Sequence, residues 1–250
     1  MNSIVLTTTN SSTSDFNKFS YRLANSMTLK DDLICLSNLN IYYTWKNFKA
    51  EYDNTSIEYV YVPSNVTVSI RIPDGSYDVK QLNNVIHHFM EKNKHTERDG
   101  SFGINLYANP VYNRVTVSVS NKFIISKMSN GLKTSLGIGS NQLPLTNTDV
   151  NGVNVPKIER VETVLVHCNL VQNLYQQDSS LIYSFTPNGR YGMLLNEKPN
   201  FPLWRETRQN SKITEININF TDQEYRPLEI EDSVLIELQL VHESYIKPSY

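Results

Sequence analysis

The chain has few glycines, few cysteines and almost no net charge. Of its 250 residues, 9 are glycine and 2 are cysteine, and 23 basic residues stand against 25 acidic ones. Two cysteines cannot build a disulfide scaffold, and because Cys35 and Cys168 both lie in apolar runs, we expect buried free thiols in a reducing compartment. A net charge of −2 excludes a DNA-packaging role that would need a strongly cationic domain, but leaves a local basic patch possible.

Long apolar runs are also missing. No stretch approaches the ~20 apolar residues of a membrane span, and the first nine residues lack the cationic and apolar segments of a secretion signal. We therefore expect neither a membrane span nor secretion, and we interpret the Asn-X-Ser/Thr sequences as accidental in a chain with 29 asparagines. These sequences begin at Asn10, Asn54, Asn65 and Asn219.

Alternating apolar and polar residues dominate the rest of the chain and predict β-strands. Apolar residues make up 39% of the sequence, enough for a real core, and 15 tyrosines and 29 asparagines suit strands joined by polar loops. Eight or nine such segments predict an all-β sandwich or barrel. The segments are 33–45, 57–61, 66–72, 104–106 with 115–119 as a hairpin, 161–170, 181–185, 193–195, 213–220 and 234–241.

One amphipathic helix interrupts this pattern. Val79, Leu82, Ile86 and Met90, with further apolar residues at 85 and 89, follow a 3.6-residue period. Asp78 is the expected N-cap, and the glutamine three residues after it completes a capping box. A second, shorter helix is suggested at 131–136, closed by a glycine.

We expect an N-terminal arm at residues 1–30, partly flexible, followed by a single domain at 31–250. Residues 7–14 hold almost no apolar side chain, whereas later aromatics suggest either an arm anchored on a neighbouring surface or an ordinary tail. Lys18, Arg22 and Lys30 would be the contacts of this arm with a nucleic acid genome.

Two groups of residues have the composition of a chemical site. His88, Glu91 and His95 could share a helix face and bind a metal, but a fourth ligand is not identifiable and solvated histidines are the simpler interpretation. His167 and Cys168 suggest a thiol nucleophile, yet adjacent residues of a strand point to opposite faces, which favours a core cysteine.

No pattern favours an enzyme. The segment Gly137-Ile138-Gly139 lacks the third glycine of a dinucleotide-binding motif, and no nucleophile elbow is present. The acidic residues of Asp31-Asp32 and 229–232 are expected in solvated turns. The sequence therefore identifies no catalytic, cofactor-binding or metal-binding residue.

Basic residues cluster weakly in two places, at 122–133 and at Arg205, Arg208 and Lys212. The second group lies beside Phe201, Pro202 and Trp204. It is consistent with an aromatic-basic surface or with a loop packed by its own aromatics, and the second interpretation is the simpler.

Several short sequence motifs, called phrases below, together resemble those of a known family. In order and spacing they are similar to the minor capsid (penton) protein of Polinton/Maverick elements and adintoviruses, over roughly residues 16–240. The phrases are Met27-Thr28-Leu29, Ile41-Tyr42-Tyr43-Thr44-Trp45-Lys46-Asn47, Ile72-Pro73-Asp74-Gly75-Ser76-Tyr77, Phe220-Thr221-Asp222-Gln223 and Arg226-Pro227-Leu228.

The resemblance implies a single jelly-roll antiparallel β-sandwich with one inserted amphipathic helix. It also implies a virion protein without cofactors, five copies of which form the capsomer at each icosahedral vertex, beside a double jelly-roll major capsid protein. Assembly would take place inside the host cell. The chain is about half as long as a double jelly-roll subunit needs to be, which favours the vertex protein.

Two other functions stay open. One is a jelly-roll module that binds a receptor or a carbohydrate. The other is an enzyme on a cupin-like scaffold, which would need two or three histidines and a carboxylate converging from strands. Most histidines here lie in the helix region or singly, as at His167 and His242, so the enzyme is the weakest alternative.

Overall fold

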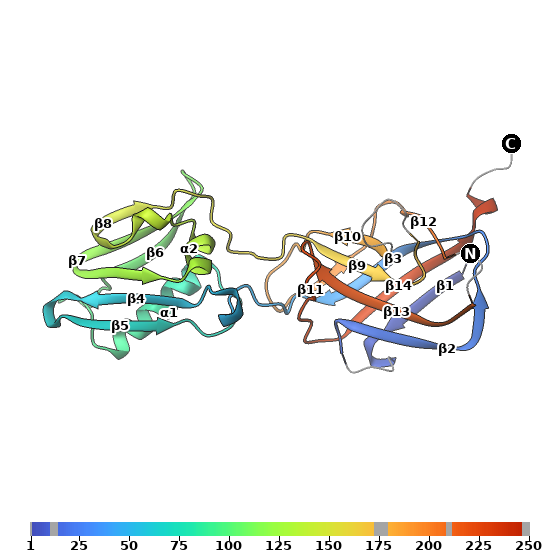
Figure 1. Ribbon diagram of the computed structural model, residues 1–250, viewed down its shortest axis with the longest axis horizontal. Helices are drawn as coiled ribbons and strands as arrows, with labels where there is room; N and C mark the ends of the chain where they lie inside the picture. The colour runs from blue at the N-terminus through green and yellow to red at the C-terminus, as the bar shows by residue number, and fades with distance from the viewer. Residues whose placement is uncertain (1, 11–14, 173–179, 209–211, 247–250) are drawn as a thin grey trace. The chain divides into compact units, whose positions relative to one another are not determined.

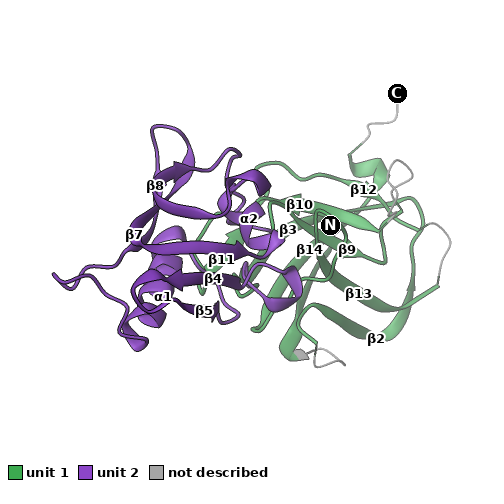
Figure 2. Ribbon diagram, turned by 60° about the vertical axis from the view of Figure 1, so that its left-hand side comes forward, with its two compact units in different colours: residues 1–45, 161–250 green, residues 46–160 purple. Residues whose placement is uncertain are grey.

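The computed structural model describes residues 2–10, 15–172, 180–208 and 212–246, and it divides the chain into two compact units. Unit 1 comprises residues 1–45 and 161–250, and unit 2 comprises residues 46–160 (Figure 2). Each unit has a hydrophobic core of its own. The sequence instead suggested one domain over 31–250. The chain passes from unit 1 to unit 2 after residue 45 and returns after residue 160, so neither boundary lies at the expected residue 30.

Unit 1 is a jelly-roll sandwich of two antiparallel sheets, which confirms the predicted fold class (Figure 1). One sheet has the order β1-β14-β3-β11, with β12 pairing the same strand β3, and the other has the order β10-β9-β13-β2. The strands are β1 (Asn2–Thr7), β2 (Lys18–Thr28), β3 (Asp32–Tyr42), β9 (Val164–Cys168), β10 (Leu181–Phe185), β11 (Leu194–Glu197), β12 (Arg205–Glu206), β13 (Lys212–Asp222) and β14 (Val234–His242).

The core of unit 1 follows directly from the alternation in these strands. In β13, Ile216, Ile218 and Phe220 are fully buried, whereas the asparagines between them face away from the core. Tyr43 and Trp45 share the same core, where their rings stack with centroids 4.4 Å apart. Both aromatic side chains therefore belong to the core of unit 1.

Residues 1–30 contribute two strands to the sandwich, although a partly flexible arm was expected there. β1 pairs with β14 and β2 pairs with β13, and Leu6 and Phe19 are buried in the core. Both strands lie at sheet edges and expose most of their side chains, so their local sequence resembles that of a polar tail. The part of the predicted flexible segment at 11–14 lies outside the described residues.

Unit 2 is inserted between β3 and β9, and it contains strands that the sequence pattern does not distinguish from those of the sandwich. Its sheet has the order β5-β4-β7-β6, and β8 also pairs with β7. Period-two alternation shows that a strand has a buried face but does not show which core that face joins. The strands are β4 (Ser56–Tyr61), β5 (Val66–Arg71), β6 (Ile104–Asn109), β7 (Arg114–Met128) and β8 (Leu145–Asn151).

Two helices complete unit 2. The predicted helix is α1 (Val79–Lys92), and the capping box is confirmed, since Asp78 Oδ1 accepts a hydrogen bond from Gln81 N at 2.7 Å and Gln81 Oε1 accepts one from Asp78 N at 2.8 Å. Its apolar face buries Leu82, Ile86 and Met90 in the core of the unit. The shorter helix is α2 (Asn130–Leu136). Among the described residues, no helix is long and apolar enough to cross a membrane.

Two of the phrases that carry the family resemblance meet in unit 2. Asn47 Oδ1 accepts a hydrogen bond from Tyr77 N, and Asn47 Nδ2 donates one to Tyr77 O, both at 2.9 Å. The backbone groups of Phe48 and Gly75 bond each other reciprocally at 2.9 and 3.0 Å. The side chain of Asn47 therefore ties the start of the unit to the turn that leads into α1.

The closing phrase of the resemblance begins the connection between the last two strands with a tight turn. The buried Asp222 accepts hydrogen bonds from Glu224 N at 2.8 Å and Arg226 N at 3.0 Å through Oδ1, and from Arg226 Nε at 2.7 Å through Oδ2. Tyr225 takes a positive φ of 60° between them. One carboxylate thus satisfies two backbone donors of the turn, and the carbonyl of the same residue accepts a third, Tyr225 N, at 3.0 Å.

We predict that Asn47→Ala destabilises unit 2 by about 2–4 kcal/mol, because it leaves the backbone N–H and C=O of Tyr77 without their partners in a mostly buried site. Hydrogen exchange of peptides from 46–160, followed by mass spectrometry, measures this directly. The matched control is Asn141→Ala, an exposed asparagine whose loss should change stability by less than about 0.5 kcal/mol. Equal exchange in the two variants would contradict the prediction.

Candidate assembly surfaces

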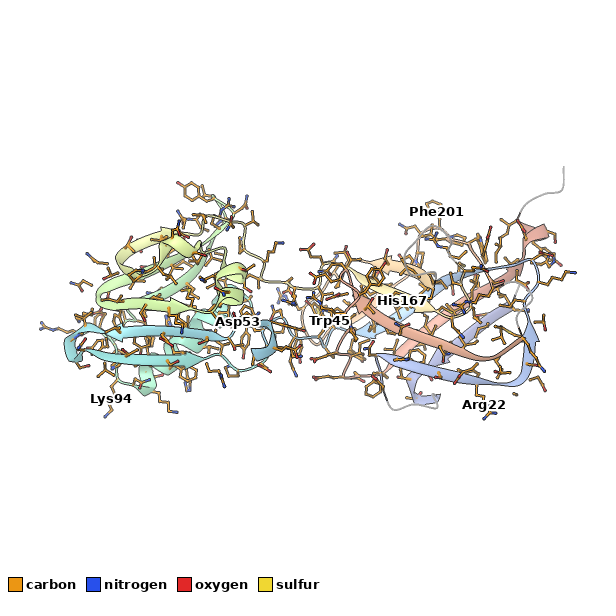
Figure 3. All side chains as sticks on the ribbon, viewed as in Figure 1. Arg22, Trp45, Asp53, Lys94, His167 and Phe201 are labelled. Carbon is orange, nitrogen blue, oxygen red and sulfur yellow. The ribbon has the colours of Figure 1, made fainter. Side chains whose placement is uncertain are left out.

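One flank of unit 1 is the free edge of β2. In the described part of the chain β2 pairs with β13 alone, from Lys18 opposite Asn219 to Thr28 opposite Lys212. No other strand of the described chain pairs with its outer side, so β2 is an edge strand. Most of its eleven residues are exposed, and Arg22 points away from the sheet (Figure 3). We call this flank the β2 edge.

The opposite flank carries the Phe201 surface, which we define as residues 201–208. Phe201 is 78% exposed, and Leu203 and Arg208 are exposed beside it (Figure 3). The segment is nevertheless anchored, because the buried Thr207 donates its hydroxyl to Asp32 O at 2.9 Å. Phe201 projects outward, so this is not a loop packed by its own aromatics, as the simpler interpretation of the sequence held.

These two surfaces lie on opposite sides of the sandwich (Figures 1 and 2). β2 is an edge strand of one sheet, whereas β11 and β12 pair with β3 at an edge of the other sheet. They also differ in character, since one is a mostly exposed edge strand and the other presents an aromatic side chain with arginines. A subunit with two different flanks can contact its neighbours head to tail.

The structure does not bring the candidate metal ligands together. His88 and Glu91 are exposed on α1, whereas His95 is buried beyond the helix end. There, His95 Nδ1 lies 2.9 Å from Tyr59 Oη, and its ring stacks on Tyr61 with centroids 4.1 Å apart. No group of three or more histidine, cysteine or acidic residues suited to a metal occurs in the part of the chain that the structure describes.

His167 and Cys168 are both buried on β9 and point to opposite faces of its sheet. Cys168 joins the core of unit 1, where burial raises the pKa of its thiol to about 12. His167 Nε2 lies 2.9 Å from Thr221 Oγ1 on β13, on the other face (Figure 3). A thiol held neutral and turned away from the imidazole cannot be activated by it.

The acidic pairs lie in turns. Asp31 takes a positive φ of 53° between β2 and β3, and Asp32 Oδ2 accepts a hydrogen bond from Lys30 N at 2.9 Å. At the other site, Glu231 N donates to Thr44 Oγ1 at 2.9 Å. These geometries shape the backbone and do not bring paired carboxylates onto a common substrate position.

The basic cluster at 122–133 does not act as one patch. Lys122 forms an ion pair with Glu97, and Lys127 forms one with Glu58 at 3.9 Å. Lys133 pairs with no carboxylate of a described residue and instead lines a pocket that also contains Lys157. Sequence reasoning missed Lys157, because nothing in the spacing indicates that positions 133 and 157 share a pocket.

We predict that unit 2 loses stability as the pH falls below about 6.5, the ordinary pKa of histidine. Burial lowers the pKa of both His95 and His87. A group whose folded pKa is lowered stabilises the fold fully above its unfolded pKa and loses this contribution as the pH falls toward the folded value. Hydrogen exchange of 46–160 between pH 7.5 and pH 5 measures the loss.

His95→Gln should flatten this pH dependence, because glutamine does not titrate and its carbonyl can accept the Tyr59 hydroxyl. His88→Gln is the matched control, since His88 is exposed on the same unit. The prediction fails if both variants show the same dependence as the unchanged chain.

Comparison with known proteins identifies a similar fold. No protein-family model matches the sequence, and no curated protein matches it. The fold is similar to the crystal structure of the mavirus penton protein, with a TM-score of 0.50 and 9% sequence identity, over 96% of this chain and 99% of that chain. Such coverage cannot omit residues 46–160, so the likeness extends to both units. The resemblance to penton proteins is thereby confirmed at the level of the fold: the chain has the fold of a viral penton protein.

Proposed function

We propose that this chain is a structural minor capsid protein, a penton, and that five copies form the capsomer at the vertices of an icosahedral virion. The observation that carries the proposal is the fold likeness to a viral penton protein over nearly the full length of both chains. A jelly-roll alone occurs in many unrelated proteins. A jelly-roll with a second unit inserted after its third strand, matched over 96% of the chain, is a narrower correspondence.

The surfaces of unit 1 support a ring. Rotational assembly needs a heterologous interface, in which one patch of a subunit meets a different patch of the next copy. The β2 edge and the Phe201 surface are two such patches on opposite flanks. Exposed aromatic and arginine side chains are the residue types enriched at the centres of interfaces. The role is structural and requires no catalytic group.

Further partners follow from this role. The capsomer would sit beside a double jelly-roll major capsid protein and assemble inside the host cell. Lys18 and Arg22, exposed on β2, and the exposed Lys30 are the proposed weak contacts with the genome. Such contacts would weaken as the salt concentration rises.

We predict that the purified chain forms a pentamer, and that Phe201→Asp weakens it by roughly 30-fold or more, since a central interface aromatic contributes about 2 kcal/mol or more. Phe201 is exposed, so the variant should keep its fold. Light scattering and native mass spectrometry give the oligomeric mass. Val111→Asp is the matched control, because Val111 is 81% exposed but lies in unit 2. A chain that stays monomeric even at high protein concentration would contradict the proposal and favour the module that binds a receptor or a carbohydrate.

Co-expression with the cognate major capsid protein provides the second test. We expect closed particles that carry this chain at their vertices when imaged by electron microscopy. Particles assembled with Phe201→Asp should have vacant vertices, whereas those with Val111→Asp should be complete. Closed particles whose vertices lack the unchanged chain would refute the penton assignment while leaving the fold intact.

A further inference from the structure

Unit 2 contains a pocket whose lining is basic and rich in hydrogen-bonding groups. It has a volume of about 600 Å³, within the usual range for small-molecule sites. Residues of α2, of the loop after it and of the segment 154–157 line it. The polar side chains that line it are Asn130, Lys133, Thr134, Ser140, Asn154 and Lys157.

α2 and the segment 154–157 are held together by backbone contacts that only glycine permits. Gly137 ends α2 at a φ of +72°, and its carbonyl accepts a hydrogen bond from Asn154 N at 3.0 Å. A Cβ on Gly137 would lie 2.2 Å from Asn154 O, and one on Gly152 would lie 2.7 Å from Gly137 O. The pocket is therefore formed by the fold itself, which reduces the ordering that a ligand would have to impose.

A glutamine side chain braces the loop after α2. Gln142 Oε1 accepts a hydrogen bond from Gly139 N at 2.7 Å, and Gln142 Nε2 donates one to Asn151 O at 2.9 Å. The loop that carries Ser140 is thereby fixed to the end of β8. Both bonds use the Gln142 side chain, so they leave the hydroxyl of Ser140 available.

The charges of the pocket are uncompensated within unit 2. Neither Lys133 nor Lys157 forms an ion pair with a described residue, and no residue lining the pocket carries a carboxylate. The nearby Asp53 accepts Asn130 N at 3.1 Å and so caps α2 (Figure 3). The side chains of Asn130, Ser140 and Asn154 make no hydrogen bond to any described residue. Two ammonium groups and three free amide or hydroxyl groups therefore face a common space.

We propose that this pocket binds an acidic saccharide, a sugar that carries sulfate or carboxylate groups. The ammonium groups of Lys133 and Lys157 would pair with the anionic oxygens, and the amide and hydroxyl side chains would bond the sugar hydroxyls. The proposal concerns unit 2 alone, and it does not depend on pentamer formation.

The lining distinguishes this ligand from other anions. A free sulfate can accept hydrogen bonds from the ammonium, amide and hydroxyl groups, but it has no hydroxyl group to donate to the amide oxygens, whereas a sugar does. Sites for single-stranded nucleic acid typically stack the bases on aromatic side chains. No aromatic side chain lines this pocket. Sulfated and carboxylated sugars would both be recognised through their anionic groups. The experiment therefore tests one sugar of each kind.

The experiment is calorimetric titration of the full-length chain at low salt with a sulfated disaccharide, a sialylated trisaccharide, a neutral trisaccharide and inorganic sulfate. We expect one of the two acidic sugars to bind and the neutral sugar and sulfate not to bind measurably. Lys133→Gln and Lys157→Gln should each raise the Kd about tenfold through the loss of a charge-assisted hydrogen bond. Higher salt should weaken the binding.

Lys80→Gln is the matched control, because it removes one exposed positive charge from α1, outside the pocket. It should change the Kd by less than about twofold, since a distant exposed charge is screened. An equal loss in all three lysine variants would show non-specific attraction and overturn the proposal, as would absence of binding by both acidic sugars. Tighter binding of a single-stranded oligonucleotide than of either sugar would also overturn it. Light scattering on the same samples reports oligomeric state separately, so failure of this site and failure of the capsid role are distinguishable.

Discussion

The antiparallel pairing of β3 with β14 is the constraint on which the rest of unit 1 depends. It joins residues about two hundred positions apart, from Asp32 opposite His242 to Ile41 opposite Val234. β1 attaches to the free side of β14, and β11 and β12 attach to the free side of β3. Because the ladder spans the interruption at 46–160, the sandwich can close only after the inserted unit and the returning strands have been made, which gives it a high contact order.

Much of this fold could be predicted from the sequence, because its signals are local. The alternation in 213–220 identified β13 and its buried face, and Asp78 with Gln81 marked the start of α1. The division into two units could not be predicted in this way. Ile57 and Ile216 follow the same period-two pattern, yet one is buried in the core of unit 2 and the other in the core of unit 1. Which core a strand joins is decided by long-range pairing, and local pattern carries no record of it.

The functional surfaces were harder to foresee for the same reason. Phe201, Arg205 and Arg208 are close together in the sequence, but the segment that carries them is anchored by the hydrogen bond from Thr207 to Asp32, a contact across 175 positions. β2 resembled a polar tail because an edge strand has only one partner. The pocket of Lys133 and Lys157 arises from the close approach of Gly137 to Asn154, and no single-sequence signal indicates it.

Two separate cores also allow the two proposed roles to be independent. The assembly flanks are made of residues of unit 1, and every residue that lines the lysine pocket belongs to unit 2. A packed interior transmits a change in volume to its own neighbours, because protein cores are as dense as organic crystals. Since no described buried cluster is common to both units, a substitution that reshapes the pocket leaves the packing of the sandwich unchanged. A change to the proposed ligand pocket in the insertion would therefore leave the proposed assembly flanks of the jelly-roll in place.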